Sequence, residues 1–172
     1  PQQLPRIGAT MFDTLFNDQA GHGAANCIDG VDNNLCHSGQ VNTNEPWLMI
    51  DMGAAYTVYE VDIYNRADCC QERLSWNIAN NANLGYEIVI SNTASDPVTG
   101  ALVTCAFNDA TRTIDVATHA CEGTGRYVYL RLPGAQRVVN IAEVKIYSST
   151  TSNYLRIGAQ PSNLAFYNWG RE

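Results

Sequence analysis

Apolar and polar residues alternate along much of this chain with a repeat of two. Tyr59, Val61 and Ile63 form the apolar side of one such segment, and residues 86–90 repeat the pattern. A repeat of two places neighbouring side chains on opposite faces of a strand, so each segment predicts a strand with one buried face. No window of a dozen residues has the apolar spacing of a helix.

Short apolar runs continue this series, and turn signals separate them. Asp96-Pro97, Glu122-Gly123 and Pro133-Gly134 are typical of turns. Many short strands with polar turns predict an all-β fold, an antiparallel sandwich or barrel. The other predicted strands are residues 7–11, 47–53, 101–107, 111–116, 126–132 and 138–147. The strand 47–53 is expected to end in a turn at Gly53, and residues 74–85, which are polar and rich in Asn, are expected to form a loop.

The composition fits one folded domain. The chain has 172 residues, 45% of them hydrophobic, and a net charge of −7. A nucleic-acid partner requires a basic face, so the acidic balance argues against one. No apolar run approaches the ~20 residues that cross a bilayer, which excludes a transmembrane helix.

Six cysteines form an even set without a zinc-type spacing. We therefore expect three disulfides and a secreted, extracellular protein. The chain begins with Pro1 and shows no signal segment, so we expect that segment to have been removed. The cysteines are Cys27, Cys36, Cys69, Cys70, Cys105 and Cys121.

The stretch Asn65–Arg73, here named the arginine loop, concentrates unusual chemistry in nine residues. Arg66 and Arg73 each carry a planar fork of donors, and Asp68 can hold one fork by a charge-assisted pair. A bond between its adjacent cysteines would fix the backbone in a strained shape. Such donors suit vicinal sugar hydroxyls, a phosphate or a carboxylate. A solvated surface loop, its cysteines bonded elsewhere, is the alternative.

A second loop, Asn26–Ser38, is rich in Asn, Asp and Gly, and is here named the Asx loop. Turn chemistry accounts for most of it, and its oxygens would also suit a hard cation. The sequence offers no GxSxG motif and no free cysteine beside a histidine, so we expect no catalytic site.

Taken together, His37, Arg66, Asp68 and Arg73, with Cys69-Cys70 directly after the aspartate, resemble the motif of the F-type lectins, or fucolectins. The resemblance covers about residues 7–148. Surrounding phrases also match, namely Ile28-Asp29-Gly30, Pro46-Trp47, Ile50-Asp51-Met52-Gly53, Gly125-Arg126-Tyr127-Val128, Leu132-Pro133-Gly134 and Ala142-Glu143-Val144. It implies an antiparallel jelly-roll β-sandwich over residues 1–149, discoidin-like as in the C domains of coagulation factors V and VIII. Its binding loops would lie at one end.

The resemblance also implies roles for residues. His37, Arg66 and Arg73 would hydrogen-bond an α-L-fucose, and Asp68 would hold the arginines. The bonded Cys69 and Cys70 would lie against the apolar edge of the sugar. Phe12, Leu15 and Phe16 are candidates to seat the methyl group, with core packing as the alternative for each.

Members of this family bind calcium, and their pattern points to four residues here. The ligands would be the carbonyl oxygens of Asn26 and Val31, the side chain of Asp29 and the carboxylate of Glu143. Oxygen ligands of this kind suit Ca²⁺. The alternative is an Asx-turn loop with Glu143 on the surface.

Two departures from the family pattern concern His37 and a cysteine. The gap between His37 and Arg66 is 28 residues, longer than usual in the family, so His37 would reach the sugar from a shifted position. The family often places a cysteine where this chain has Ala142. The resemblance supports Cys69–Cys70 and Cys105–Cys121 as pairs, and Cys27–Cys36 is the pair that remains.

We therefore expect a secreted, calcium-binding lectin that recognises terminal α-L-fucose on glycans without catalysis. A discoidin-like adhesion or matrix module that binds another sugar, a protein or lipid head groups is the alternative, and homo-oligomerisation is left open. Residues 156–159 repeat Arg6-Ile7-Gly8-Ala9. We therefore expect residues 150–172 to be an extension packed on the sandwich or the start of a further repeat. A further repeat would make the chain part of a tandem lectin or of a larger enzyme.

Overall fold

A computed structural model of the chain describes residues 1–12, 20–39, 44–77 and 79–149. The predicted extension at 150–172 lies outside these residues. Ten strands are described there: β1 (Gln2–Gln3), β2 (Gly8–Met11), β3 (Cys36–His37), β4 (Trp47–Asn65), β5 (Trp76–Asn77), β6 (Ala82–Asn83), β7 (Tyr86–Ser91), β8 (Ala101–Phe107), β9 (Val116–Arg131) and β10 (Asn140–Ser148). Three 3-10 turns accompany them: η2 (Ala20–His22), η3 (Ala24–Cys27) and η4 (Gln71–Leu74).

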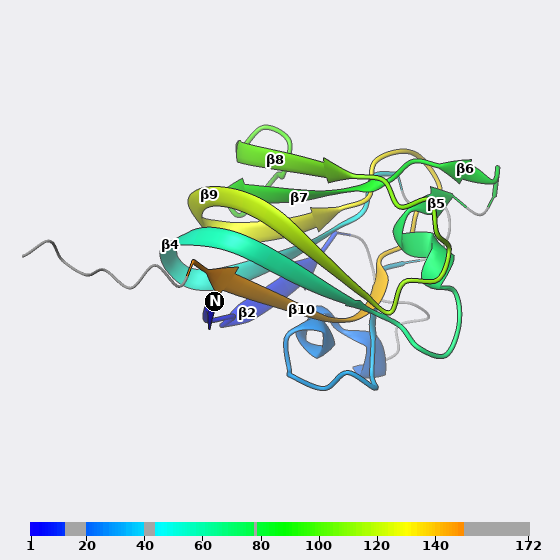
Figure 1. Cartoon of the computed structure of the whole chain (residues 1–172), viewed down its shortest axis with the longest axis horizontal. Coiled ribbons are helices and arrows are strands. Elements are labelled where there is room, and N and C mark those ends of the chain that lie inside the picture. The colour runs from blue at the N-terminus through cyan, green and yellow to red at the C-terminus, as the bar shows by residue number, and fades with distance from the viewer. Residues whose placement is uncertain (13–19, 40–43, 78, 150–172) are drawn as a thin grey trace, which may run out of the picture.

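One eight-stranded antiparallel sheet forms the sandwich by curling on itself (Figure 1). Its order is β1-β10-β4-β9-β7-β8, with β2 added to β4 and β3 added to β10. The long strands β4 and β9 pair twice, once around Leu48 and Leu130 and again around Ile63 and Ala117. Each of these strands therefore belongs to both layers, and the expected antiparallel β-sandwich is present.

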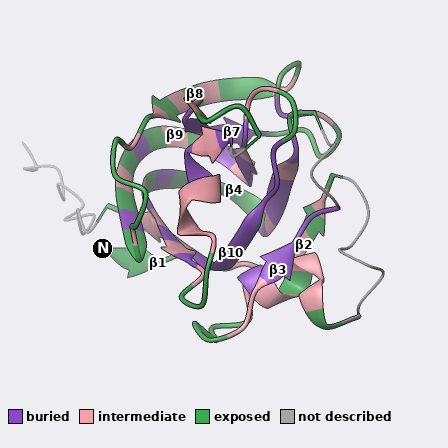
Figure 2. Cartoon of the chain, turned by 90° about the vertical axis from the view of Figure 1, so that its right-hand side faces the viewer, coloured by how far each residue is buried: buried purple, intermediate pink, exposed green. Residues whose placement is uncertain are grey.

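The core lies inside the curl (Figure 2). Apolar side chains from both layers meet there, and their removal from water is the main force that favours the fold. Members less than 2% exposed include Leu48, Ile50, Val61, Ile63, Ile88, Ile90, Val128 and Ile146.

The predicted strands 47–53 and 59–64 are one strand, β4, so the expected turn at Gly53 is wrong. Gly53 has φ +83°, and a Cβ there would lie 2.9 Å from Cδ1 of Ile7. Only glycine suits this bend, which turns the strand without ending it. A second irregularity between Val58 and Glu60 reverses the alternation: Val58 is buried, whereas Tyr59 is 41% exposed.

The predicted turn at Glu122-Gly123 is also wrong, because β9 runs through it. A Cβ on Gly125 would lie 2.7 Å from Cγ2 of Ile90, so the glycine permits β9 to pass close to β7.

The predicted strand 111–116 is absent from the described chain before Val116. The backbone carbonyl of Asp115 instead accepts a hydrogen bond from the Asn65 N–H at 2.8 Å. The predicted loop at residues 74–85 contains the small β5–β6 hairpin.

Three disulfides join the cysteines in the expected pairs, Cys27–Cys36, Cys69–Cys70 and Cys105–Cys121. The last of these ties the edge strand β8 to β9. None of the helical segments described is long and apolar enough to span a membrane.

Candidate functional site

The arginine loop leaves the end of β4 and enters η4. Its disulfide joins Cys69 to Cys70, whose Cα atoms are 3.8 Å apart. Cys70 has φ +65°, a left-handed conformation that non-glycine residues seldom adopt. The ring formed by the adjacent cysteines holds this conformation, so the loop presents its side chains from a fixed backbone.

Arg66 and Asp68 form a bidentate ion pair inside this loop. Arg66 Nε donates to Oδ1 of Asp68 at 2.7 Å, and Nη2 donates to Oδ2 at 2.6 Å. The Arg66 guanidinium lowers the pKa of the Asp68 carboxyl to about 2. One edge of the Arg66 fork is therefore committed to Asp68, and Nη1 remains for another acceptor.

The side chains of Asn65 and Gln71, which belong to no recognised motif, fix the base of the arginine loop. Asn65 Nδ2 donates to the Gln71 carbonyl at 2.9 Å, and Asn65 Oδ1 accepts from the Arg66 N–H at 3.0 Å. Gln71 in turn donates to Asp115 Oδ1 at 2.7 Å. These contacts close a ring from β4 to the start of β9 and hold the loop before any ligand arrives.

Arg137 lies beneath the same region and is 1% exposed. Its guanidinium donates to the carbonyls of Leu74 at 2.9 Å, Gly85 at 3.0 Å and Pro133 at 2.9 Å. Burial lowers the pKa of Arg137 to about 10. The side chain ties the end of the arginine loop to two neighbouring segments. Arg137 stands between a predicted turn and a predicted strand, where an arginine side chain is usually exposed. The sequence therefore did not indicate this role.

His37 comes together with the two arginines despite the long gap in sequence. It lies in β3, opposite Asn140 of β10, and is 5% exposed. Burial lowers the pKa of His37, and the nearby charges of Arg73 and Arg66 lower it further. His37 Nδ1 is 2.6 Å from the Ser38 carbonyl, which can only accept, so Nδ1 carries the proton and Nε2 is the acceptor of the neutral ring.

The charge of Arg73 is less compensated than that of Arg66, which is paired with Asp68. Burial lowers its pKa, and the neighbouring Arg66 lowers it further. Arg73 Nε is buried and has no hydrogen-bond partner within the described part of the chain. A buried donor of this kind costs free energy unless a ligand accepts from it.

His22 of η2 was not among the sequence-predicted residues, yet it lies close enough to His37 to lower its pKa. The side chain of Asn26 fixes η2 through a hydrogen bond to the Gly21 carbonyl at 2.6 Å. The only available signal was an isolated histidine in a glycine-rich segment, which is too common to indicate a site.

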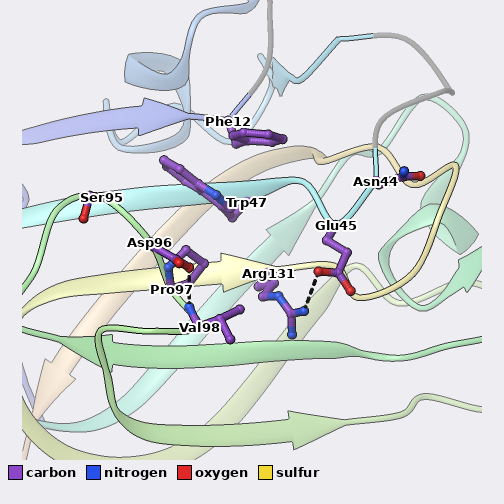
Figure 3. A pocket seen from close by; sticks show the side chains of 9 residues that line it. All are labelled: Phe12, Asn44, Glu45, Trp47, Ser95, Asp96, Pro97, Val98 and Arg131. Carbon is purple, nitrogen blue, oxygen red and sulfur yellow. Dashed lines mark hydrogen bonds and ion pairs between the residues drawn. The ribbon is translucent and has the colours of Figure 1, made fainter.

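Phe12 packs on Trp47, with ring centroids 5.7 Å apart. The two rings line a cavity of about 340 Å³ with Glu45, Asp96 and Arg131 (Figure 3). Neither Arg66 nor Arg73 lines this cavity. Two other residues expected near the sugar, Leu15 and Phe16, lie outside the described residues.

The expected calcium ligands lie where the Asx loop meets β10. The Gly30 N–H donates to Glu143 Oε2 at 2.9 Å, which brings Asp29 beside Glu143. Glu143 is fully buried, so its alternative as a surface residue is wrong. Its Oε1 is in ionic contact with Arg6 and accepts no hydrogen bond of good geometry from the described residues.

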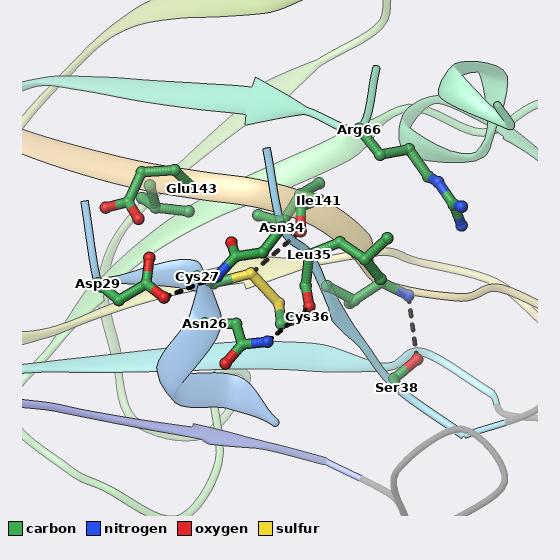
Figure 4. The surroundings of a disulfide bond; sticks show 12 residues. Asn26, Cys27, Asp29, Asn34, Leu35, Cys36, Ser38, Arg66, Ile141 and Glu143 are labelled. Atoms are coloured by element: carbon green, nitrogen blue, oxygen red, sulfur yellow. Dashed lines mark hydrogen bonds between the residues drawn. A yellow bond between two sulfur atoms is a disulfide. The ribbon is translucent and has the colours of Figure 1, made fainter. Parts of the chain in front are cut away.

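The Asx loop is rigid around this point (Figure 4). Asp29 accepts from the Val31 N–H at 2.9 Å and from Asn34 Nδ2 at 2.7 Å, and the Asn26 amide donates to the Leu35 carbonyl at 3.1 Å. Across the described ranges, no group of three or more His, Cys, Asp or Glu side chains is arranged to hold a metal. Two carboxylates with loop carbonyls fit a hard cation, and Arg6 supplies a competing positive charge.

Comparison with known proteins places these features in a family. The model of the NedA-like, galactose-binding domain of the F5/F8 type C group matches residues 26–130. The fucolectin of Anguilla anguilla is 33% identical over 148 residues, which cover 80% of this chain and 85% of that protein.

Solved structures agree on the fold. A fucolectin from the serum of Morone saxatilis (striped bass) has a TM-score of 0.68 and 27% identity. The match covers 85% of this chain and 49% of that one, so this chain spans about half its length. The lectin domain of lectinolysin complexed with Lewis B antigen has a TM-score of 0.64, 22% identity and coverage of 83% and 92% of the two chains. From the matched domain, the sequence identity and the shared fold, this chain belongs to the fucolectin family of F5/F8 type C, discoidin-like domains.

Proposed function

We propose that this chain is a lectin that binds terminal α-L-fucose on glycans and carries out no reaction on them. The observation that carries the proposal is the buried Nε of Arg73, which has no partner among the described residues. It lies in a loop with Arg66 and close to His37. The names of its relatives, fucolectins from an eel and a bass, support the same sugar.

The chemistry of each residue suits a polyol. Arg73 and the free edge of Arg66 would donate to sugar oxygens, while Nε2 of neutral His37 would accept from a hydroxyl. The Cys69–Cys70 disulfide offers an apolar surface for the C–H edge of the ring. Because the arginine loop is fixed beforehand, little conformational entropy would be lost on binding.

A neutral ligand is favoured over phosphate or sulfate by the charge of the site. Asp68 already neutralises Arg66 through two hydrogen bonds, and burial disfavours the charge on Arg73. The overall charge of −7 also repels anions. The alternative of an adhesion module for lipid head groups lacks a comparable observation.

Calcium is the second part of the proposal. Asp29, Glu143 and the carbonyls of Asn26 and Val31 would hold the ion, which would neutralise the two carboxylates and stiffen the Asx loop. The full burial of Glu143 beside the Asx loop supports this assignment, and Arg6, the ionic partner of its Oε1, would have to give way to the ion. The three disulfides support an extracellular location.

The direct test is calorimetric titration of the purified chain with methyl α-L-fucoside, in parallel with methyl α-D-galactoside and inorganic phosphate. We expect saturable binding of the fucoside and much weaker binding of the other two. Absence of fucoside binding by a folded, fully oxidised protein would refute the proposal.

A further inference from the structure

The cavity beside Phe12 and Trp47 is separate from the proposed fucose site. Its volume of about 340 Å³ lies within the range of small-molecule sites, about 300–1,000 Å³. It lies where the ends of β2 and β9 meet the start of β4 and the loop between β7 and β8 (Figure 3). Neither His37 nor the arginine loop lines it, so the proposed fucose binding makes no use of this cavity.

One wall of the cavity is aromatic. Phe12 packs on Trp47, and Trp47 meets the ring of Tyr129 edge-on, with centroids 5.4 Å apart. Tyr129 is fully buried and supports Trp47 from the protein side. Phe12 is 46% exposed, although an aromatic ring gains free energy when it is buried. An exposed ring at a cavity suits contact with the C–H groups of a ligand.

The opposite side of the cavity is charged (Figure 3). Arg131 pairs with Glu87 at 2.5 Å and with Glu45 at 2.9 Å, and its side chain is only 14% exposed. Burial alone would lower the pKa of Arg131, but the two carboxylates outweigh burial and raise this pKa. An ion pair so far removed from water adds little to the stability of a fold, so stability is a weak reason for its presence.

Glu45 itself is strained. It has φ +52°, a left-handed conformation that non-glycine residues seldom adopt, and its N–H donates to the Gly134 carbonyl at 2.9 Å. Its side chain is 50% exposed beside the cavity. Backbone strain of this kind is concentrated at functional sites.

The third side is the loop between β7 and β8, which is held in place by Asp96. Asp96 Oδ1 accepts from the Val98 N–H at 2.7 Å, and Oδ2 accepts from the Thr99 hydroxyl at 2.9 Å. Pro97 and the 58% exposed Val98 add apolar surface to the cavity. The cavity is therefore built before a ligand arrives, which reduces the entropy lost on binding.

The charges and the aromatic wall together select the class of ligand. Two carboxylates and one guanidinium line the cavity, and Glu87 pairs with the same guanidinium, so an anion is disfavoured. A guanidinium has more N–H donors than its two contacts use, and Glu45 places an acceptor beside them. Adjacent donors and acceptors match the neighbouring hydroxyls of a sugar.

We infer that this cavity is a second carbohydrate site, which binds a neutral pyranose with equatorial hydroxyls, as in glucose. Such a ring has C–H groups on both faces and hydroxyls at its edge. One face can lie against Phe12 and Trp47 while the edge reaches Arg131 and Glu45. The inference does not depend on the proposed fucose binding, because the cavity contains neither the arginine loop nor His37.

The experiment is calorimetric titration of the purified chain with methyl β-D-glucoside, choline and inorganic phosphate. We expect the glucoside to bind with a dissociation constant on the order of 1 mM, the value of a few hydrogen bonds and one ring contact. The same constant should be measured in excess methyl α-L-fucoside, because the sites are separate. Choline and phosphate should bind at least about 10-fold more weakly, since both signs of charge line the cavity.

Variants at exposed positions assign the binding to this cavity. Phe12→Ala should weaken glucoside binding about fivefold through loss of the ring contact. Glu45→Gln should weaken it about 10-fold through loss of the charged acceptor, and should leave fucoside affinity unchanged. Tyr59→Ala is the control, because it removes a ring of β4 that is 41% exposed and lies outside the cavity. Arg73→Ala should lose fucoside affinity and bind the glucoside as wild type does.

Absence of glucoside binding by the folded wild type, displacement of the glucoside by the fucoside, or unchanged glucoside affinity in Phe12→Ala would overturn the second site. Tighter binding of choline than of the glucoside would overturn its assignment to a neutral sugar. Glucoside binding by a wild type that ignores the fucoside would refute the proposed function and support the second site.

Discussion

Arg66 and Asp68 face each other through two parallel hydrogen bonds, Nε to Oδ1 at 2.7 Å and Nη2 to Oδ2 at 2.6 Å. The Asp68 side chain is 65% exposed, whereas that of Arg66 is 12% exposed. The carboxylate therefore orients the guanidinium from the solvent side and adds little to the stability of the fold.

Asp68→Ala should consequently weaken fucoside binding about 10-fold through loss of Arg66 orientation, and should change the melting temperature little. Calorimetry and thermal unfolding measure the two effects. Glu122→Gln, which removes an exposed carboxylate on β9 outside the arginine loop, is the control and should bind within about twofold of wild type. A large drop in stability with unchanged affinity in Asp68→Ala would contradict this role.

Arg73→Ala should reduce fucoside affinity about 100-fold, the value of lost hydrogen bonds from a charged donor. Arg73→Lys should recover only part of the loss, because an ammonium cannot reproduce the planar fork. Neither change should lower the free energy of unfolding much, since Nε of Arg73 has no partner among the described residues. Strong destabilisation of Arg73→Ala would show that the side chain serves the fold instead.

Arg137→Met should lower the free energy of unfolding by about 2–4 kcal/mol, because buried carbonyl acceptors lose their donor. Arg126→Met is the matched control: its guanidinium pairs with Asp51 and is 42% exposed, so about 1 kcal/mol or less should be lost. Urea unfolding measures both. Since Arg137 also holds the Leu74 carbonyl, the folded fraction of Arg137→Met should bind the fucoside more weakly, and an unchanged affinity would argue against that link.

The lowered pKa of His37 predicts a loss of stability in mild acid. The unfolded chain has an ordinary histidine pKa near 6.5 and takes up a proton there, whereas the folded chain does so only at lower pH. Stability from this residue is therefore complete above about pH 7 and falls as the pH drops through 6.5 toward the folded pKa. His119 has a pKa lowered by burial and acts in the same direction.

Urea midpoints at pH 7.5 and pH 5.5 should differ for wild type, and His37→Gln should show a smaller difference. His119→Gln provides the comparison for the second histidine, and the double variant should be the least sensitive to acid. Equal midpoints for wild type at the two pH values would refute the prediction.

Calcium should raise the melting temperature, because an ion bound only to the folded state stabilises it by about 2.7 kcal/mol at 100 times its dissociation constant. A chelator should reverse the shift. Magnesium is the control ion, since it prefers stricter octahedral geometry and keeps its waters. Glu143→Gln should abolish the response, and identical melting curves with calcium and with chelator would rule out a calcium site.

Local patterns were sufficient to predict the arginine loop, because its donors and cysteines are consecutive in sequence. The strands β7 and β8 were predicted for a similar reason, as their alternation is uninterrupted. Partners that depend on tertiary structure were not visible. Arg137 donates to the carbonyls of Leu74 and Gly85, more than 50 residues away. Every residue has a backbone carbonyl, so the sequence cannot indicate which carbonyls a buried arginine will bind.

Two errors in the strand prediction, at Gly53 and at Gly123, have one physical cause. Gly53 and Gly123 read as turn signals, yet both lie within continuous strands where the sheet bends or neighbouring chains approach closely. A glycine has the same local signature in a turn and in a bent strand, and only the packing of Ile7 or Val103 against it distinguishes them.

The curl of β4 and β9 also separates the residues that form the sandwich from the loop residues at the candidate site. Both layers depend on the same two strands, so a substitution there affects the whole sandwich at once. The arginine loop and the Asx loop are joined to that scaffold at their ends, and each contains its own disulfide. Exposed residues of the Asx loop, such as Asp32 and Asn33, can therefore be exchanged without a change in the strands that form the two layers.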